Sequence, residues 1–493
     1  MNDDNVPKRN GNQPQRNDNA RYRNDEKSLE VLTHLTIQEC RVSRPFTRQQ
    51  SLLLLPHHSL IFQILSTTMA PRNGLMAITP LFLLIFLFAT YGLLTNVTEL
   101  GMVYLFGAVS LFAFFFVRGV PMTERLRSFW RGAIHRDLQM MVWIFILAGI
   151  FSSTAKGMGA VDATVNLTLR LLPSDLILAG MFLAACFISL SMGTSVGTIV
   201  ALVPVATGIT EHTSLSLPLI VAAVVGGALF GDNLSFISDT TVVATRTQGC
   251  QMRDKFAVNI RIVLPAALLT FLLYILFGYG QSGVVEVSQV EWLKVIPYLA
   301  VLVLALFGIN VLLVLCVGCV LTFGVGCWQN CMTMTEWLRL GWNGINGMIC
   351  LIAISVMAGG LLGLVKRGGG ISYLLYLLTR RISSQHEAEM TIAGMVCVTN
   401  LCTANNTIAI LSVGTLAKNI AVRFGVDPRK SASLLDTFSC FIQGIIPYGA
   451  QILMAAGLAA LSPFDIIPYL FYPYLMGISA LLAIRFRYPK KYR

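Results

Sequence analysis

Charged residues are scarce in this sequence. Asp, Glu, Lys and Arg make up 12% of its 493 residues, whereas soluble domains average roughly 25%. This shortage argues against a soluble globular chain. What the sequence has instead is long uncharged runs, such as Ile78–Leu94 and Ile262–Phe277, which approach the ~20 residues needed to cross a bilayer. We therefore predict an all-α, polytopic transmembrane helical bundle.

Signals of catalytic and metal-binding sites are also few. The sequence has neither an H-E-x-x-H motif nor a phosphate-binding glycine loop followed by Lys and Ser or Thr. Most of its 11 cysteines lie in apolar segments, and Cys327 and Cys331 have no His at zinc-ligand spacing. The net charge of +12 comes from Lys and Arg in short loops between apolar runs, which is typical of membrane proteins. We expect no enzyme activity, no cofactor and no nucleic-acid partner; the lipid bilayer is the expected partner.

Residues 1–68 differ in composition from the rest. Met1–Lys27 is rich in Asn, Arg, Asp and Gln and cannot bury a core, so we expect this N-terminal extension to be disordered. We hypothesise that translation begins at Met69 or Met76, just before the first apolar segment. Intact-mass measurement tests this, because a mass that includes residue 2 onward would refute it.

The remaining sequence contains an internal repeat. The stretch that starts at Ile146 (I-L-A-G-I-F-S-S-T-A-K-G-M-G) resembles the one that starts at Ser355 (S-V-M-A-G-G-L-L-G-L-V-K-R-G-G-G) at a shift of 210 residues. At a shift of 211, S-M-G-T-S-V-G-T from Ser191 aligns with C-T-A-N-N-T-I-A from Cys402. We therefore predict two transmembrane repeats, residues 69–280 and 281–493.

Basic residues indicate how the two repeats are oriented. The loop Thr210–Leu217 has no Lys or Arg, whereas its counterpart Ala421–Lys430 has three. Conversely, Arg118–Arg136 holds five Arg and its counterpart Asn330–Gly347 one. Basic loops are cytoplasmic, so the repeats are predicted to be inverted, with both termini in the cytoplasm and the chain in the cell (inner) membrane. A further cytoplasmic loop is expected after Asp239, with Arg246, Arg253, Lys255 and Arg261.

About 10–14 membrane segments are expected by hydropathy. Several are shorter than ~20 residues and contain Gly, which is typical of broken helices or re-entrant hairpins. Segments 295–308 and 311–326 could together be one long tilted span. The predicted segments lie near 77–95, 99–117, 138–154, 176–193, 195–210, 217–231, 261–280, 295–308, 311–326, 347–365, 390–404, 405–420, 436–457 and 463–485.

Polar residues interrupt the apolar segments at matching places in the two halves. Phe230–Thr241 (F-G-D-N-L-S-F-I-S-D-T-T) puts two carboxylates at membrane depth, where an ionisable group by default marks a functional site. Oxygen-bearing side chains around a carboxylate suit a hard cation or a proton. Ser191–Thr198, Thr399–Thr407 and Phe441–Gln451 are similar interruptions. We predict a site for Na⁺ and H⁺ made of Asp232, Asp239, Ser235, Ser238, Thr240, Thr194, Ser195, Asn405, Asn406, Thr407 and Gln443, with Asp232 and Asp239 as Na⁺ ligands.

Structural roles are the alternative for each of these residues. The helix is expected to break at Asp232, so this residue could cap a helix end or pair with Lys156 or Lys366. Asp239 could be an N-cap, and the hydroxyls could bond back to their own helices. We expect both lysines to extend to the membrane interface and Asp436 to be a solvated cap near the cytoplasm.

Around Phe230–Thr241, and on through Ala244–Lys255 (A-T-R-T-Q-G-C-Q-M-R-D-K), the sequence resembles the NhaC family of sodium/proton antiporters. The resemblance implies secondary antiport, with Asp232 and Asp239 as candidate cation or proton ligands. One departure is Asn233, where members commonly have Lys. This leaves one fewer positive charge near Asp232 and would alter cation preference or the pH at which the carboxylate loads.

Three functions remain open. The first, which we favour, is exchange of cytoplasmic Na⁺ for external H⁺ by alternating access. The second is Na⁺- or H⁺-coupled exchange of a small organic acid such as malate or lactate, which the family also includes. It needs a cationic or helix-dipole anion site, which Lys156 or Lys366 could supply if they face inward. The third is a passive ion channel. The sequence does not fix the oligomeric state, so a homo-oligomer is compatible with it.

Overall fold

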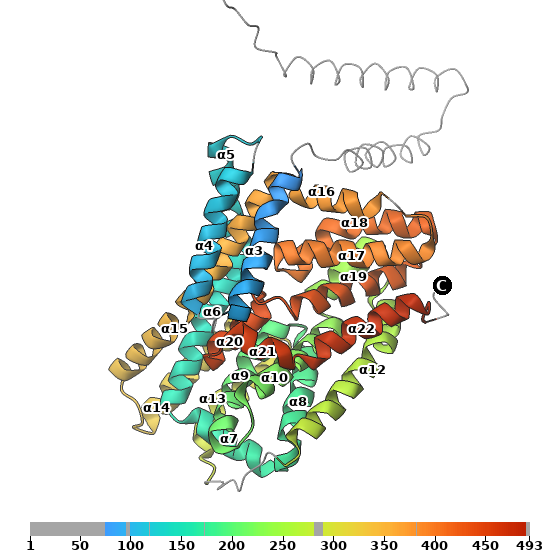
Figure 1. Cartoon of the computed structure of the whole chain (residues 1–493). Coiled ribbons are helices and arrows are strands. Elements are labelled where there is room, and N and C mark those ends of the chain that lie inside the picture. The colour runs from blue at the N-terminus through green and yellow to red at the C-terminus, as the bar shows by residue number, and fades with distance from the viewer. Residues whose placement is uncertain are drawn as a thin grey trace, which may run out of the picture. The chain divides into compact units, whose positions relative to one another are not determined.

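A computed structural model describes residues 74–94, 99–117, 119–171, 173–280, 289–380 and 382–489. All regular elements in these ranges are helices, which confirms the all-α prediction (Figure 1). Residues 1–68 and both termini lie outside the described ranges, as do the predictions of a disordered extension and of an internal start.

Ten α-helices described in residues 74–280 make up the first half. Most match a predicted segment, but the short helices α5, α7 and α11 were not foreseen. The helices are α3 (Gly74–Leu94), α4 (Glu99–Phe116), α5 (Met122–Ala133), α6 (Arg136–Gly157), α7 (Ala160–Leu171), α8 (Ile177–Met192), α9 (Ser195–His212), α10 (Leu217–Leu234), α11 (Asp239–Gln248) and α12 (Met252–Gly278).

The second half follows the same plan. The predicted segment 436–457 is divided by a break at 444–449, and α13 and α14 are separate helices packed on each other, so one long tilted span there is wrong. The helices are α13 (Trp292–Leu306), α14 (Val311–Trp328), α15 (Met334–Arg367), α16 (Gly370–Thr379), α17 (Gln385–Thr403), α18 (Asn406–Phe424), α19 (Pro428–Gln443), α20 (Ala450–Ala459), α21 (Pro463–Ile466) and α22 (Phe471–Arg485).

The helix boundaries repeat at the shift found in the sequence. Adding 211 to the bounds of α11 (239 and 248) gives 450 and 459, the bounds of α20. The starts of α9 and α10 (195 and 217) likewise map onto the starts of α18 and α19 (406 and 428). Even side-chain contacts recur, because Ser189 Oγ donates to the Ala228 carbonyl (2.5 Å) and Asn400 Nδ2 donates to the equivalent Ser439 carbonyl (2.7 Å).

The turns between paired helices have the same backbone in both halves. Gly193 is left-handed (φ 68°) and Thr194 extended (φ −146°, ψ 123°); Ala404 (φ 47°) and Asn405 (φ −146°, ψ 117°) repeat this. Helix α8 packs against α9 and α17 against α18, so each turn is the tip of a helical hairpin. Helical hairpins are therefore formed at matching places in both halves.

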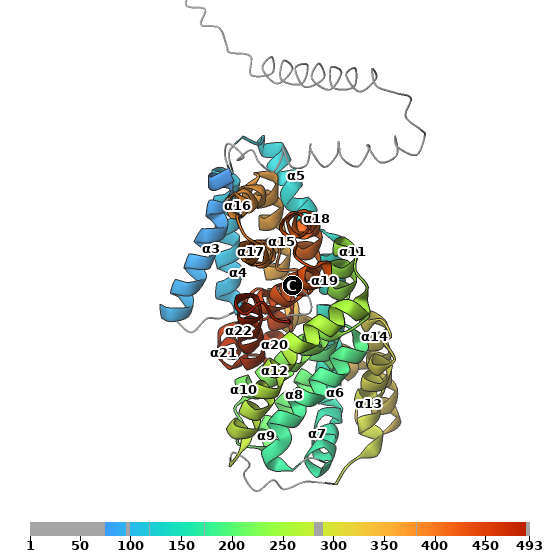
Figure 2. The same cartoon turned by 90° about the vertical axis from the view of Figure 1, so that its right-hand side faces the viewer.

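The two repeats are inverted, as predicted. Helix α11 packs on α18 while α20 packs on α9, so the same contact is made twice with the halves exchanged. In both views α7 and α9 lie near one end of the described part of the chain, and α16 and α18 lie near the opposite end (Figures 1 and 2). The α8–α9 and α17–α18 hairpins therefore lie toward opposite ends of the described part of the chain.

By length and composition, six helical stretches within the described residues could cross a membrane, and the bent pair α20–α21 could be a seventh. Shorter apolar stretches of 10–17 residues, such as Ile177–Met192, Trp292–Leu306 and Phe471–Arg485, lie beside them. Leu217–Gln248, formed by α10 and α11, is 83% buried. Glycines bring α8 against α10, since a Cβ at Gly227 would lie 2.3 Å from the Phe182 carbonyl oxygen. This central helix carries Asp232.

Candidate functional site

Asp232 lies in the last turn of α10, which continues to Leu234, two residues beyond the expected break. Its carboxylate is buried and accepts hydrogen bonds from two serine hydroxyls: Ser195 Oγ to Oδ2 at 2.8 Å and Ser238 Oγ to Oδ1 at 2.6 Å. Ser195 begins α9 and Ser238 is the N-cap residue of α11. The carboxylate thus faces two helix N-termini, whose dipoles stabilise negative charge.

Two glutamine amides of the second repeat are connected to the Asp232 carboxylate through Ser195. Gln451 Nε2 donates to Ser195 Oγ (2.9 Å), and Gln443 Nε2 donates to Gln451 Oε1 (2.9 Å). Gln443 Nε2 also donates to the Ala404 carbonyl at the tip of the second hairpin (3.0 Å). Asp232 is therefore connected through side chains to the α17–α18 hairpin and to the α19–α20 break.

A cavity of about 170 Å³ opens beside Asp232, lined by both hairpin tips and by both helix breaks. Ser235 is set apart from the other predicted residues: it is buried, its Oγ donates to the Leu190 carbonyl (2.9 Å), and it has a structural role at the end of α10. The predicted residues that line the cavity are Thr194, Ser195, Asp232, Ser238, Asp239, Thr240, Asn405, Asn406, Thr407 and Gln443.

The contacts of individual residues bear on the structural roles considered for them. Asp232 pairs with neither lysine: Lys156 is exposed and bonds to Glu211 (2.9 Å), and Lys366 lines a different cavity. Asp239 is exposed in the first turn of α11, where Ser238 and not Asp239 is the N-cap. Its carboxylate borders the cavity without the hydroxyl partners that hold Asp232.

Asp436 contradicts the expectation of a solvated cap. It lies in the middle of α19, is fully buried and forms an ion pair with Lys255, which is 1% exposed. Lys255 had been assigned to a basic cytoplasmic loop, yet it lies in the first turn of α12 and points inward. Sequence inspection missed it because a lysine near a segment end usually reaches water.

A second buried ion pair joins α17 to α19. Lys430 Nζ lies 2.8 Å from Glu389 Oε1, and both side chains are buried. Lys430 had been counted in the basic loop Ala421–Lys430, and that assignment is also wrong. Arg423, in the last turn of α18, is exposed and still fits a helix end in water.

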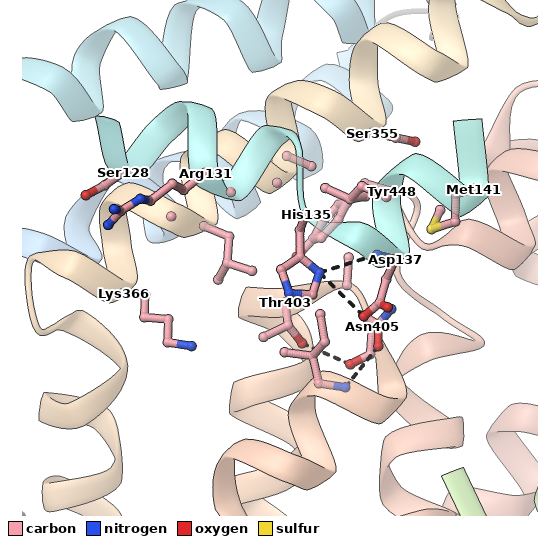
Figure 3. A pocket seen from close by; sticks show the side chains of 18 of the residues that line it. Ser128, Arg131, His135, Asp137, Met141, Ser355, Lys366, Thr403, Asn405 and Tyr448 are labelled. Atoms are coloured by element: carbon pink, nitrogen blue, oxygen red, sulfur yellow. Dashed lines mark hydrogen bonds and ion pairs between the residues drawn. The ribbon is translucent and has the colours of Figure 1, made fainter. Parts of the chain in front are cut away.

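A wider cavity of about 570 Å³ adjoins the first, sharing Asp137, Met141, Ala404 and Asn405 with it. Its lining is basic: Arg131, His135, Lys366 and Arg367 contribute side chains from α5, α15 and the turn before α6. Figure 3 shows His135 turned toward Asp137: its Nδ1 accepts from the Asp137 backbone N–H (3.4 Å) and lies 3.5 Å from Asp137 Oδ2. The shared lining residues place the two cavities next to each other.

Gly193–Gly197 (G-T-S-V-G) matches the G-x-S-x-G spacing of hydrolase nucleophile elbows. In those enzymes the serine follows a strand and works with a histidine. Here the serine lies between two helices and donates to Asp232, and the described residues that line its cavity include no histidine. Ser195 therefore orients a carboxylate. The oxygens around it are of the kind that binds a hard cation.

The model of the Na⁺/H⁺ antiporter family matches residues 27–279 and 284–489. The chain belongs to this family. The resemblance to NhaC antiporters is thereby confirmed, and membership makes the chain a membrane transporter whose surroundings are lipid.

Characterised relatives of this antiporter family member differ in cargo. It is 22% identical to the Na⁺/H⁺ antiporter NhaC of Alkalihalophilus pseudofirmus, over 70% of this chain and 81% of that protein. It is 21% identical to the malate-2H⁺/Na⁺-lactate antiporter of Bacillus subtilis, over 71% and 81%. Among solved structures, the YdaH transporter of Alcanivorax borkumensis matches with a TM-score of 0.35 and 14% identity, over 85% of this chain and 99% of that one.

Proposed function

We propose that this protein is a sodium/proton antiporter of the cell membrane that exchanges cytoplasmic Na⁺ for external H⁺. Asp232 is the shared carrier of the two ions. The observation that carries this proposal is a buried carboxylate held by two hydroxyls, Ser195 and Ser238, beside a cavity at the meeting point of two inverted repeats. Family membership and the NhaC relatives support it.

Competition at one carboxylate explains the exchange. A protonated Asp232 has no charge to hold Na⁺, and an ionised one attracts it, so the site carries one ion or the other. The hydroxyls of Ser195, Ser238 and Thr240 supply neutral oxygens for the cation. Alternating access between inverted repeats, here 69–280 and 281–493, then exposes the site to each side in turn.

The orientation of the chain follows from its basic residues. Arg131 and Lys366 line the wider of the two cavities, and basic residues near span ends favour the cytoplasm. On this assignment the cavity faces the cytoplasm and both termini lie there. A single cysteine at Arg131 in a cysteine-free background should react with an impermeant maleimide only from the cytoplasmic side; reaction from outside would reverse the topology.

The test is Na⁺-induced dissipation of a preset pH gradient in proteoliposomes. Wild type should respond to Na⁺, and Asp232→Asn should fall to the level of empty liposomes because the variant can neither load a proton nor attract a cation. Asp162→Asn removes an exposed carboxylate of α7 outside both cavities and should leave exchange unchanged. Full exchange by Asp232→Asn, with equal insertion, would refute the assignment.

A second candidate, exchange of a small organic acid, is favoured by one observation. Lys366 and Arg131 line the wider cavity (Figure 3), and these two cationic side chains suit a carboxylate. In the same proteoliposomes, Na⁺-dependent uptake of labelled malate or lactate that is lost in Lys366→Gln would establish it. A Na⁺ response without any uptake of either acid leaves the first candidate.

A further inference from the structure

The Lys255 ammonium is surrounded by oxygen atoms from three helices. It forms the ion pair with Asp436 of α19, and it donates to the Asn233 carbonyl of α10 (2.6 Å) and to Thr241 Oγ1 of α11 (2.9 Å). These helices meet where α10 ends and α11 begins. The ammonium therefore lies in the break of the same interrupted helix that holds Asp232, one residue along from it.

The oxygens around Lys255 are the ones a metal cation would use. The Asn233 carbonyl accepts no helical backbone hydrogen bond because α10 ends at the next residue. Carbonyls released in this way at broken helices coordinate cations in transporters. A carboxylate and a hydroxyl complete the set. The Asp232 cavity has the same chemistry, with a carboxylate and hydroxyls at the same break. Lys255 fills with its own side chain a set of ligands that suits Na⁺.

The oxygens are also held in place independently of Lys255. Asn259 Nδ2 donates to the Asn233 carbonyl (3.0 Å) and to its Oδ1 (2.6 Å). The Asn259 Oδ1 in turn accepts from Ser433 (2.5 Å) and Thr437 (2.8 Å) of α19. A side-chain network thus fixes α10 against α19 even where the ammonium is not involved.

The architecture itself does not require this ion pair. A shift of 211 places uncharged residues at the four equivalent positions of the other half: Ile466 for Lys255, Gly444 for Asn233, Ile452 for Thr241 and, in reverse, Val225 for Asp436. The second break is formed without any of these polar groups. The lysine therefore belongs to the chemistry of the first break rather than to the fold of a break.

We propose that the Lys255 ammonium is a tethered cation that occupies a second cation site beside the Asp232 cavity, and that Na⁺ takes this site when the ammonium is removed. The Lys255–Asp436 pair also has a consequence for ion exchange, which rests on the proposed function. Lys255 neutralises Asp436, so Asp232 is left as the buried carboxylate that ions can load, with Asp239 at the border of its cavity, and one cation is exchanged at a time.

The test compares wild type, Lys255→Met and Lys255→Met/Asp436→Asn by equilibrium binding of radioactive ²²Na⁺ in detergent at alkaline pH. Met keeps the apolar stem of lysine and vacates only the ammonium position. Lys255→Met should bind one Na⁺ more than wild type, and the double variant should lose this gain because the carboxylate is gone. An unchanged number of bound Na⁺ in folded Lys255→Met would overturn the proposal.

Folding of the single variant is itself informative. An unpaired buried carboxylate is destabilising, so Lys255→Met should be recovered as monodisperse protein in NaCl and poorly in choline chloride. If it fails in both salts while the double variant folds, Na⁺ cannot replace the ammonium and the proposal fails. The number of Na⁺ ions that Lys255→Met binds in excess of wild type measures this second site. Absence of Na⁺ binding or exchange in wild type would instead refute the proposed antiport.

Discussion

The two helix breaks have the same backbone plan and different chemistry. The side chains of Asp232 and Lys255 lie at the break between α10 and α11, while Gln443 and Gln451 flank the mirrored break between α19 and α20. The first break presents a carboxylate. The second supplies two amides, of which Gln451 donates to Ser195 and Gln443 donates to Gln451. One repeated scaffold thus provides two geometrically equivalent places, and only one of them carries the ionisable group.

A second pair of equivalent positions shows the reverse distribution. Glu389 and Lys430 form a buried ion pair between α17 and α19, and a shift of 211 maps them onto Leu178 and Leu219, which are buried in α8 and α10. The same helix contact is thus made by charges in one half and by leucines in the other. Charges at this place are not required by the helix packing.

The largest effect is expected from moving the carboxylate across the pseudo-two-fold axis. Asp232→Asn/Gln443→Asp should remain without Na⁺/H⁺ exchange, because the equivalents of Ser195 and Ser238 at the new site are Asn406 and Gly449, which have no hydroxyl to donate. Na⁺-dependent pH changes in proteoliposomes measure this. Restored exchange would show that the breaks are functionally interchangeable.

The next largest effect, which is on stability, is expected from the buried Glu389–Lys430 ion pair. Glu389→Leu leaves Lys430 unpaired and should lower the free energy of unfolding by about 3–5 kcal/mol. Glu389→Leu/Lys430→Leu restores the leucines of the other half and should recover most of that loss. Thermal unfolding in detergent measures both variants. The exposed pair gives the control, since Glu211→Gln should cost only about 0–1 kcal/mol; a similar loss there would remove the distinction.

A smaller effect is expected from the hydroxyl that holds Asp232. Ser195→Ala removes one charge-assisted hydrogen bond and should raise the Na⁺ concentration for half-maximal exchange about tenfold. The mirrored variant Asn406→Ala should change it much less, because Asn406 bonds to Asn400 and not to Asp232. Equal effects of the two variants would contradict the asymmetry of the breaks.

Sequence patterns predicted the repeat and its breaks because Gly and polar residues inside apolar runs are local signals. The turn at Gly193 and its counterpart at Ala404 follow at the predicted shift, and candidates far apart in the sequence share one cavity. That these residues bind Na⁺ and H⁺ stays a prediction. Helix α10 does not end at Asp232 but continues to Leu234, two residues beyond the end that the sequence pattern predicted. Over this stretch it packs against α8.

Lys255 and Lys430 could not be placed in the same way. Their charge alone favours water, and only a partner that the fold brings close makes burial affordable. Asp436 is 181 residues away from Lys255, and no local pattern links them. A hint was present: Lys255 and Asn259 are four residues apart on one helix face, which indicates a polar stripe on an otherwise apolar helix.

The Lys255–Asp436 contact also sets an order of events during synthesis. Asp436 leaves the ribosome 181 residues after Lys255, which at roughly 5–20 residues per second takes on the order of ten to forty seconds. During that interval α12 holds a lysine whose partner does not yet exist. The set of oxygens around the ammonium is therefore complete only after α19 has emerged and brought Asp436 to Lys255.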